Sequence, residues 1–153
     1  MLYFAYGSNM DESQMVKRCP SARFVGVATL PDRRLAFTRK SVKRGCGVAD
    51  AVKAPEHKLW GVVYELSDAD LPMLDTAEGY GPGRTRNSYW RRECTVFLDG
   101  DADRPRPVWT YFAESEPNPP RPNQAYKNLI LSGARGRLPP EYVTELEHIN
   151  ADP

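Results

Sequence analysis

The chain has 153 residues, of which 41% are hydrophobic and 27% are charged, and its formal net charge is +1. This length and hydrophobic content suffice for one globular domain with a sizeable core, so we expect a single domain over residues 1–153. Because the net charge is close to zero, the protein has no overall positive field that would attract nucleic acid. No stretch is apolar for long enough to span a bilayer, and the apolar N-terminus lacks a basic leader, so we expect a cytoplasmic protein without a membrane partner.

The three cysteines are Cys19, Cys46 and Cys94, which are odd in number and far apart in the sequence. None belongs to a CxxC motif, and no histidine lies near them at the spacing of metal ligands. We therefore expect neither a disulfide framework nor a metal site.

The chain opens on an aromatic and apolar run, residues 2–6, that ends at Gly7, Ser8 and Asn9. Its length and composition predict a buried strand that leads into a tight turn. We expect Asn9 to cap a helix over residues 10–19, which Pro20 ends. A strand, a small-residue turn and a helix start in succession leave several backbone N–H groups unpaired, and such a place binds anions.

The next segments predict further strands. Residues 22–30 and 33–38 are rich in β-branched and aromatic side chains, and we expect a hairpin turn between them at Pro31-Asp32. The basic run from Arg33 to Arg44 is interpreted as the solvated face of a hairpin, with residues 39–45 as a mobile loop. Residues 47–52 are a weak strand candidate, whereas residues 58–66 form the clearest central strand, in which Gly61 indicates a bend or a close backbone approach.

The second half of the chain alternates short helices and strands. Residues 67–77 carry helix signals, with Pro72 favouring a late start and Gly79 a glycine cap at the end. Residues 88–98 and 108–113 are strands, residues 116–122 are a stiff proline-rich connection, and two short helices close the chain. Neighbouring strands with few βαβ alternations predict an α+β fold, a small mixed and mostly antiparallel β-barrel with short flanking helices.

Five groups of residues, taken together, carry a family resemblance that runs along nearly the whole chain. They are Leu2 to Met10 (LYFAYGSNM), Leu59 to Tyr64 (LWGVVY), Leu74-Asp75 with Glu78-Gly79, Tyr89, and Tyr126-Lys127 ahead of Gly133-Ala134, Leu138-Pro139 and Tyr142. In this order and spacing the chain resembles the γ-glutamylcyclotransferase family. The resemblance implies a small β-barrel with flanking helices, no cofactor, and cyclisation of a γ-glutamyl group to 5-oxoproline with release of the attached amine.

The resemblance implies that Glu78 is the catalytic group. Because the α-amine of the glutamyl group is an ammonium at neutral pH, one carboxyl group must remove a proton before attack and return one to the leaving amine. An ordinary Glu has a pKa of about 4.3, so we expect a partly dry site that raises it. The alternative is that Glu78 is a solvated carboxylate ahead of the cap glycine. A negative charge at a helix C-terminus is mildly unfavourable, by about 0.3–1 kcal/mol, because of the helix dipole. Asp75, one turn earlier, is the rival carboxylate and is expected to be structural.

The resemblance also implies substrate contacts from the first strand and turn and from two later tyrosines. The residues concerned are Tyr3, Phe4, Ala5, Tyr6, Gly7, Ser8, Tyr126 and Tyr89, of which Tyr89 is the weaker contact. Ordinary packing of the tyrosines in the barrel remains the alternative. Ser8 is not expected to be a nucleophile, because the sequence around it lacks the second glycine of a GxSxG elbow. The stretch at residues 79–86 departs from the family pattern in its glycines and arginines. We expect the loop at residues 79–87 to affect substrate choice, with Arg84 and Arg86 facing the leaving group.

The sequence alone leaves two possible functions. The first is an enzyme, a γ-glutamyl cyclotransferase acting on a γ-glutamyl amino acid, peptide or amine, with a homodimer left open. The second is a catalytically idle ligand-binding or protein-interaction domain on the same barrel. The presence of Glu78 favours the enzyme.

Overall fold

A computed structural model describes all of residues 1–153 and has a closed five-stranded barrel at its centre. The strands are β1 (Leu2–Ala5), β2 (Arg23–Ser41), β3 (Cys46–Glu65), β4 (Tyr89–Leu98) and β5 (Pro105–Ala113). Their order around the barrel is β1-β3-β2-β4-β5. Every pair is antiparallel except β1 and β5, which close the barrel in parallel at Tyr3 and Trp109. The predicted mixed, mostly antiparallel barrel is therefore confirmed.

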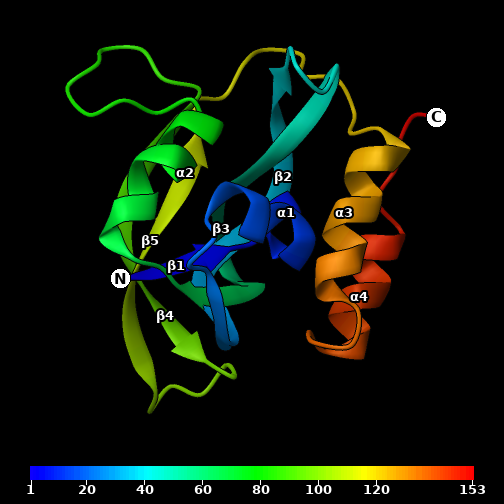
Figure 1. Cartoon of the computed structure of the whole chain (residues 1–153). Helices are drawn as coiled ribbons and strands as arrows, with labels where there is room; N and C mark the ends of the chain where they lie inside the picture. The colour runs from blue at the N-terminus through cyan, green and yellow to red at the C-terminus, as the bar shows by residue number, and fades with distance from the viewer.

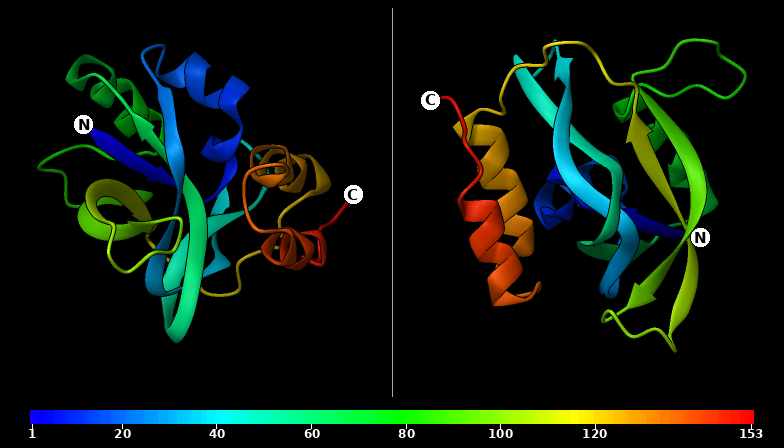
Figure 2. Two further views of the ribbon diagram at one scale, coloured as in Figure 1. Left: turned by 90° about the horizontal axis from the view of Figure 1, so that it is seen from below. Right: turned by 180° about the vertical axis from the view of Figure 1, so that it is seen from behind.

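Four short helices flank the barrel (Figure 1): α1 (Glu12–Arg18), α2 (Leu71–Ala77), α3 (Gln124–Ala134) and α4 (Pro140–Glu147). Both views in Figure 2 show α3 and α4 side by side on one flank, away from the loop that follows α2. Two 3₁₀ turns, Ser8–Met10 and Asp68–Asp70, precede α1 and α2. None of the helices combines the length and the apolarity that crossing a bilayer requires.

The long strands β2 and β3 dominate the barrel. They have 19 and 20 residues and pair along almost their whole length, from Arg23 with Glu65 to Ser41 with Cys46. The hairpin expected at Pro31-Asp32 is therefore wrong, because both predicted strands belong to β2. The weak segment at residues 47–52 belongs to β3, where pairing with β2 compensates for its poor local signal.

A bulge replaces the expected turn at Asp32. The register shifts between Pro31 and Arg33, and Asp32 has φ 57°. On the neighbouring strand Glu56 has φ 69°, and its N–H donates to Asp32 Oδ1 over 3.0 Å. Both strands thus bend together, as barrel closure requires, without reversing direction. The chain reverses at residues 42–45 instead, so of the loop expected at residues 39–45 only the last four residues lie outside the strand.

The first helix is capped differently from the prediction. Asp11, not Asn9, is its N-cap, and the Asp11 carboxylate accepts the Gln14 N–H over 2.8 Å. Asn9 belongs to the 3₁₀ turn Ser8–Met10 and is buried there. Its side chain is consequently available for contacts outside its own helix.

Close backbone contacts at glycines hold the turn that follows β1. A Cβ on Gly133 of α3 would lie 2.2 Å from the Met10 carbonyl carbon, so α3 packs directly on the turn. On Gly61 of β3 a Cβ would lie 2.4 Å from the Ala5 carbonyl oxygen, which confirms the close approach predicted there. The turn is thereby enclosed between a helix and the barrel wall.

Candidate active site

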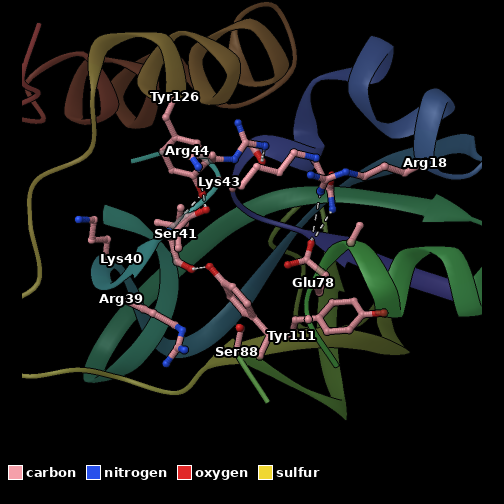
Figure 3. Close-up of a pocket in the computed structure, with 18 of the residues that line it drawn as sticks. Arg18, Arg39, Lys40, Ser41, Lys43, Arg44, Glu78, Ser88, Tyr111 and Tyr126 are labelled. Atoms are coloured by element: carbon pink, nitrogen blue, oxygen red, sulfur yellow. Dashed lines mark hydrogen bonds and ion pairs between the residues drawn. The ribbon is translucent and has the colours of Figure 1, made fainter. Parts of the chain in front are cut away.

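One cavity of about 320 Å³ opens where the turn after β1, the end of α2 and the reversal between β2 and β3 meet. Figure 3 shows the side chains that line it. Gly7, Glu78 and Tyr126 come from distant parts of the chain, and all three border this cavity. Its size is that of a small-molecule site.

Not every residue expected to bind substrate lines the cavity. Tyr3, Tyr6, Gly7, Ser8, Tyr89 and Tyr126 do. Phe4 and Ala5 do not, because the Phe4 ring and the Ala5 carbonyl pack against Gly61 of β3. Arg84 and Arg86 are exposed outside the cavity, so the expectation that they face the leaving group is not supported.

Glu78 is positioned by the C-terminus of α2. Gly79 has φ 67° and its N–H donates to Thr76 O, while the Tyr80 N–H donates to Asp75 O, so the helix ends in a Schellman motif. This ending confirms the predicted glycine cap. It places Glu78 on the last turn, with its side chain 14% exposed.

The two oxygens of the Glu78 carboxyl group have different surroundings. Oε1 accepts a hydrogen bond from Asn9 Nδ2 over 2.9 Å and lies 3.7 Å from Arg18 Nη1. Oε2 has no hydrogen bond within the protein and is not sealed off from solvent. One oxygen is therefore anchored while the other is free for a ligand, and Figure 3 shows the carboxyl group at the edge of the open space.

Burial raises the pKa of the Glu78 carboxyl above its ordinary value. The guanidinium groups of Arg18 and Arg44 and the hydrogen bond from Asn9 act in the opposite direction, and the nearby Asp75 adds to the rise. Desolvation is the largest of these effects, so the net shift of the Glu78 pKa is upward.

Asp75 is held away from the cavity by two strong partners. Its Oδ1 accepts from the Tyr111 hydroxyl and its Oδ2 pairs with Arg91 Nη1, both over 2.6 Å. The residue is 6% exposed and does not line the cavity. With both oxygens occupied, Asp75 fixes Tyr111 and Arg91 in place, which agrees with the structural role expected for it.

Two tyrosine hydroxyls are tethered to Ala49 of β3. Tyr89 donates to Ala49 O over 2.5 Å, whereas Tyr126 accepts from Ala49 N–H over 3.0 Å. Tyr126 thus keeps its own proton for another acceptor. Burial raises the pKa of Tyr126 to about 12, so its hydroxyl stays protonated at neutral pH.

The wall beside Ser8 is rich in hydrogen-bond donors. Gly7 O accepts the first bond of the 3₁₀ turn, from Met10 N–H, whereas Gly7 N–H precedes the turn and has no acceptor within the protein. The Arg44 guanidinium stacks over the Tyr126 ring at 4.9 Å, with Nη2 3.4 Å from Ser8 Oγ and 2.8 Å from Gln14 Oε1. A Cβ on Gly7 would lie 3.0 Å from the Ala49 Cβ, so only glycine fits this wall without displacement.

Comparison with known proteins agrees with this geometry. The family model described as "Gamma-glutamyl cyclotransferase, AIG2-like" matches residues 3–133. The chain belongs to this family. It is 35% identical to a γ-glutamylcyclotransferase of Bos taurus and 34% identical to that of Homo sapiens, in each case over 97% of this chain and 78% of the relative. A solved structure titled "Gamma-glutamyl cyclotransferase" superposes with a TM-score of 0.88 at 31% identity, covering 99% of this chain and 89% of the other.

Several residues of the γ-glutamyl cyclotransferase cavity were not found by sequence reasoning. Asn9 is expected as a helix cap and belongs to the first motif of the resemblance, but neither signal gives it a role in the site, and Arg18 and Tyr111 carry no signal. Arg44 was seen within the basic run but interpreted as solvated. Their positions depend on contacts between elements far apart in the chain, which local sequence patterns do not report.

Proposed function

We propose that this chain is a γ-glutamyl cyclotransferase that converts a γ-glutamyl amino acid, peptide or amine into 5-oxoproline and the free amine. The observation that carries the proposal is the Glu78 carboxyl group, which has one anchored and one unpartnered oxygen at a cavity beside the Gly7-Ser8 turn. The relatives that carry the name γ-glutamylcyclotransferase support the same activity.

The reaction is intramolecular. The α-amine nitrogen forms a bond to the γ-carbonyl carbon, the bond from that carbon to the leaving nitrogen breaks, and a five-membered lactam results. The α-ammonium loses two protons as it becomes the lactam N–H, and the leaving nitrogen gains two as it becomes an ammonium, so no water is consumed. Holding the glutamyl chain in a bent conformation supplies much of the acceleration, because reacting groups in one molecule have high effective concentrations.

Glu78 carries the proton in this proposal. Its unpartnered Oε2 takes a proton from the α-ammonium before attack, and in the next step the carboxyl group gives a proton to the leaving nitrogen as the attacking nitrogen loses its second. A carboxyl group with an ordinary pKa would be a weak acid for the second step. Burial of Glu78 raises that pKa and so brings it closer to the operating pH.

The donors beside Ser8 fit the α-carboxylate of the glutamyl group. Gly7 N–H, the Ser8 hydroxyl and the Arg44 guanidinium lie on one wall of the cavity, and together they offer a charge-assisted set of hydrogen bonds. Tyr126 is a further substrate contact, because its hydroxyl accepts from Ala49 N–H and so keeps its own proton to donate. Tyr89 has used its proton on Ala49 and can only accept, so its contribution is smaller.

The test is release of 5-oxoproline by the purified chain from a panel of γ-glutamyl amino acids, a γ-glutamyl peptide and a γ-glutamyl amine. We expect stoichiometric 5-oxoproline and free amine from at least one member, without added metal or cofactor. Binding of these compounds with no turnover of any of them would instead support the idle ligand-binding domain.

A further inference from the structure

The cavity carries more positive charge than a γ-glutamyl group can neutralise. Arg18, Arg39, Lys40, Lys43 and Arg44 line it, against the single carboxylate of Glu78. The γ-glutamyl group contributes one α-carboxylate and one α-ammonium, so its own net charge is zero. The excess of cations must therefore face either solvent or the part of the substrate that leaves.

Lys40 and Lys43 are the cations without an assigned partner. Arg18 pairs with Glu78, and Arg39 Nη1 lies 3.9 Å from Glu116 Oε2. The proposed function places Arg44 at the α-carboxylate. Neither lysine has a carboxylate within 4.0 Å of its ammonium group, and both are exposed at the mouth.

Lys43 lies in the reversal at residues 42–45 and Lys40 near the end of β2 just before it, and this reversal is anchored on both sides. Gly45, with φ 68°, donates to Ser41 O over 2.7 Å, and Arg44 N–H donates to Ser41 Oγ. From the segment before α3, Asn123 Nδ2 donates to Arg44 O over 3.3 Å. The backbone that presents the two lysines is therefore fixed with respect to the cavity.

Lys40 lies across the cavity from Glu78, and Lys43 lies beside Arg44. In Figure 3 Glu78 borders the open space on one side, and Arg39, Lys40 and Ser41 lie across from it. A γ-carbonyl within reach of Glu78 has open space for its attached amine on the side of Arg39, Lys40 and Ser41. Val42 lies between the two lysines in the chain, is 92% exposed and also lines the cavity, so it offers an apolar surface to a ligand.

We propose that Lys40 and Lys43 select γ-glutamyl substrates whose leaving amine is an acidic amino acid, with two carboxylates. This inference rests on the proposed function and specifies its substrate class. One carboxylate would occupy each ammonium group, and the carbon chain between them would contact Val42. Because both lysines are exposed, each contact is modest and weakens with salt.

The experiment compares γ-glutamylglutamate with γ-glutamylglutamine, which have the same shape and differ by one negative charge. The measured ratio is kcat/KM for γ-glutamylglutamate divided by kcat/KM for γ-glutamylglutamine, determined at low and at high NaCl. We expect the native chain to prefer γ-glutamylglutamate and to lose much of this preference at high salt. Lys40→Gln with Lys43→Gln should reduce the ratio roughly 1.4- to 5-fold, mainly through KM, because the two substrates differ by one carboxylate and so by one exposed ion pair.

The matched control is Arg84→Gln with Arg86→Gln, which removes the same net charge from exposed residues outside the cavity. Its ratio should equal that of the native chain. Equal ratios in both double variants, or a native ratio of one or less, would overturn the inference while leaving the proposed function intact. If the native chain releases no 5-oxoproline, the proposed function fails, and the same two ligands titrated calorimetrically still test the lysines through their Kd ratio.

Discussion

Asn9 Nδ2 donates a hydrogen bond to Glu78 Oε1 over 2.9 Å, although the two residues are 69 positions apart in the chain. The same nitrogen lies 3.0 Å from the Tyr3 hydroxyl, while Asn9 Oδ1 accepts from Gln14 Nε2 and from Arg18 Nη1, each over 2.9 Å. One buried amide therefore joins β1, α1 and the end of α2. It also decides which oxygen of Glu78 faces the ligand.

Replacing Glu78 with Gln should abolish turnover with little effect on folding. The amide keeps the size and much of the hydrogen bonding of the carboxyl group but cannot carry a proton. General acid-base groups contribute about 10²- to 10⁴-fold, so kcat should fall at least 100-fold, as steady-state kinetics would show. Ordinary activity of this variant on every substrate of the native chain would contradict the mechanism.

Ser8→Ala is the informative companion variant. The Gly7 N–H and the Arg44 guanidinium remain to hold the α-carboxylate, so KM should rise while kcat changes less than in Glu78→Gln. If Ser8 were a nucleophile, Ser8→Ala would be the inactive variant instead. Thermal melts of both variants exclude misfolding as the cause.

The pH dependence of activity should reflect the raised pKa of Glu78. The free enzyme needs the ionised carboxylate to accept the proton, so the acidic limb of kcat/KM should lie above the value of about 4.3 for an ordinary Glu. A pH profile of kcat/KM with γ-glutamylglutamine measures this limb. A limb at or below the ordinary Glu value would show that Arg18 and Arg44 outweigh burial.

The same shift predicts how Glu78 affects stability. Burial raises the pKa of Glu78 in the folded chain, so the folded state binds the proton more tightly than the unfolded state. The free energy of unfolding therefore falls as the pH rises from the pKa of Glu78 in the unfolded chain to its higher pKa in the folded chain. Glu78→Gln should therefore be at least as stable as the native chain at neutral pH. The difference should vanish below about pH 4, where both states are protonated. Urea unfolding at the two pH values provides the comparison.

Asn9→Ala should move the acidic limb of the pH profile further upward. The hydrogen bond from Asn9 lowers the pKa of Glu78, so removing it leaves burial less opposed. Because the Arg18 contact to Asn9 is lost as well, kcat should also fall. An unchanged pH limb together with a reduced melting temperature would indicate a purely structural role.

Gly133→Ala should destabilise the fold and weaken the site. The new Cβ would lie 2.2 Å from the Met10 carbonyl carbon, so α3 must shift away from the Ser8–Met10 turn, at a cost of about 1–3 kcal/mol. Gly26→Ala in β2 is the control, because nothing lies within 4 Å of its added Cβ. Denaturant unfolding should separate the two variants, and KM should rise only in Gly133→Ala.

Local sequence patterns were enough to predict the strand at the start of the chain, the clearest part of β3 and the ending of α2 at Gly79. In each case the signal lies within a few residues: an apolar run of strand length, or a glycine with positive φ after a short helix. The placement of Glu78 on the last turn of α2 follows from the same local rule. Its expected role came from the family resemblance, which covered almost the whole chain.

Tertiary structure decided what these segments face. Pro31 and Asp32 predict a turn because both residue types favour one locally, yet the continuous pairing of β2 with β3 makes Asp32 a bulge. The same pairing moves the reversal to residues 42–45 and so brings Lys40, Lys43 and Arg44 to the mouth of the cavity. Strand register and barrel closure depend on contacts between distant segments. The sequence by itself therefore determined the elements and the candidate proton carrier, whereas only the folded barrel decided which cations surround it.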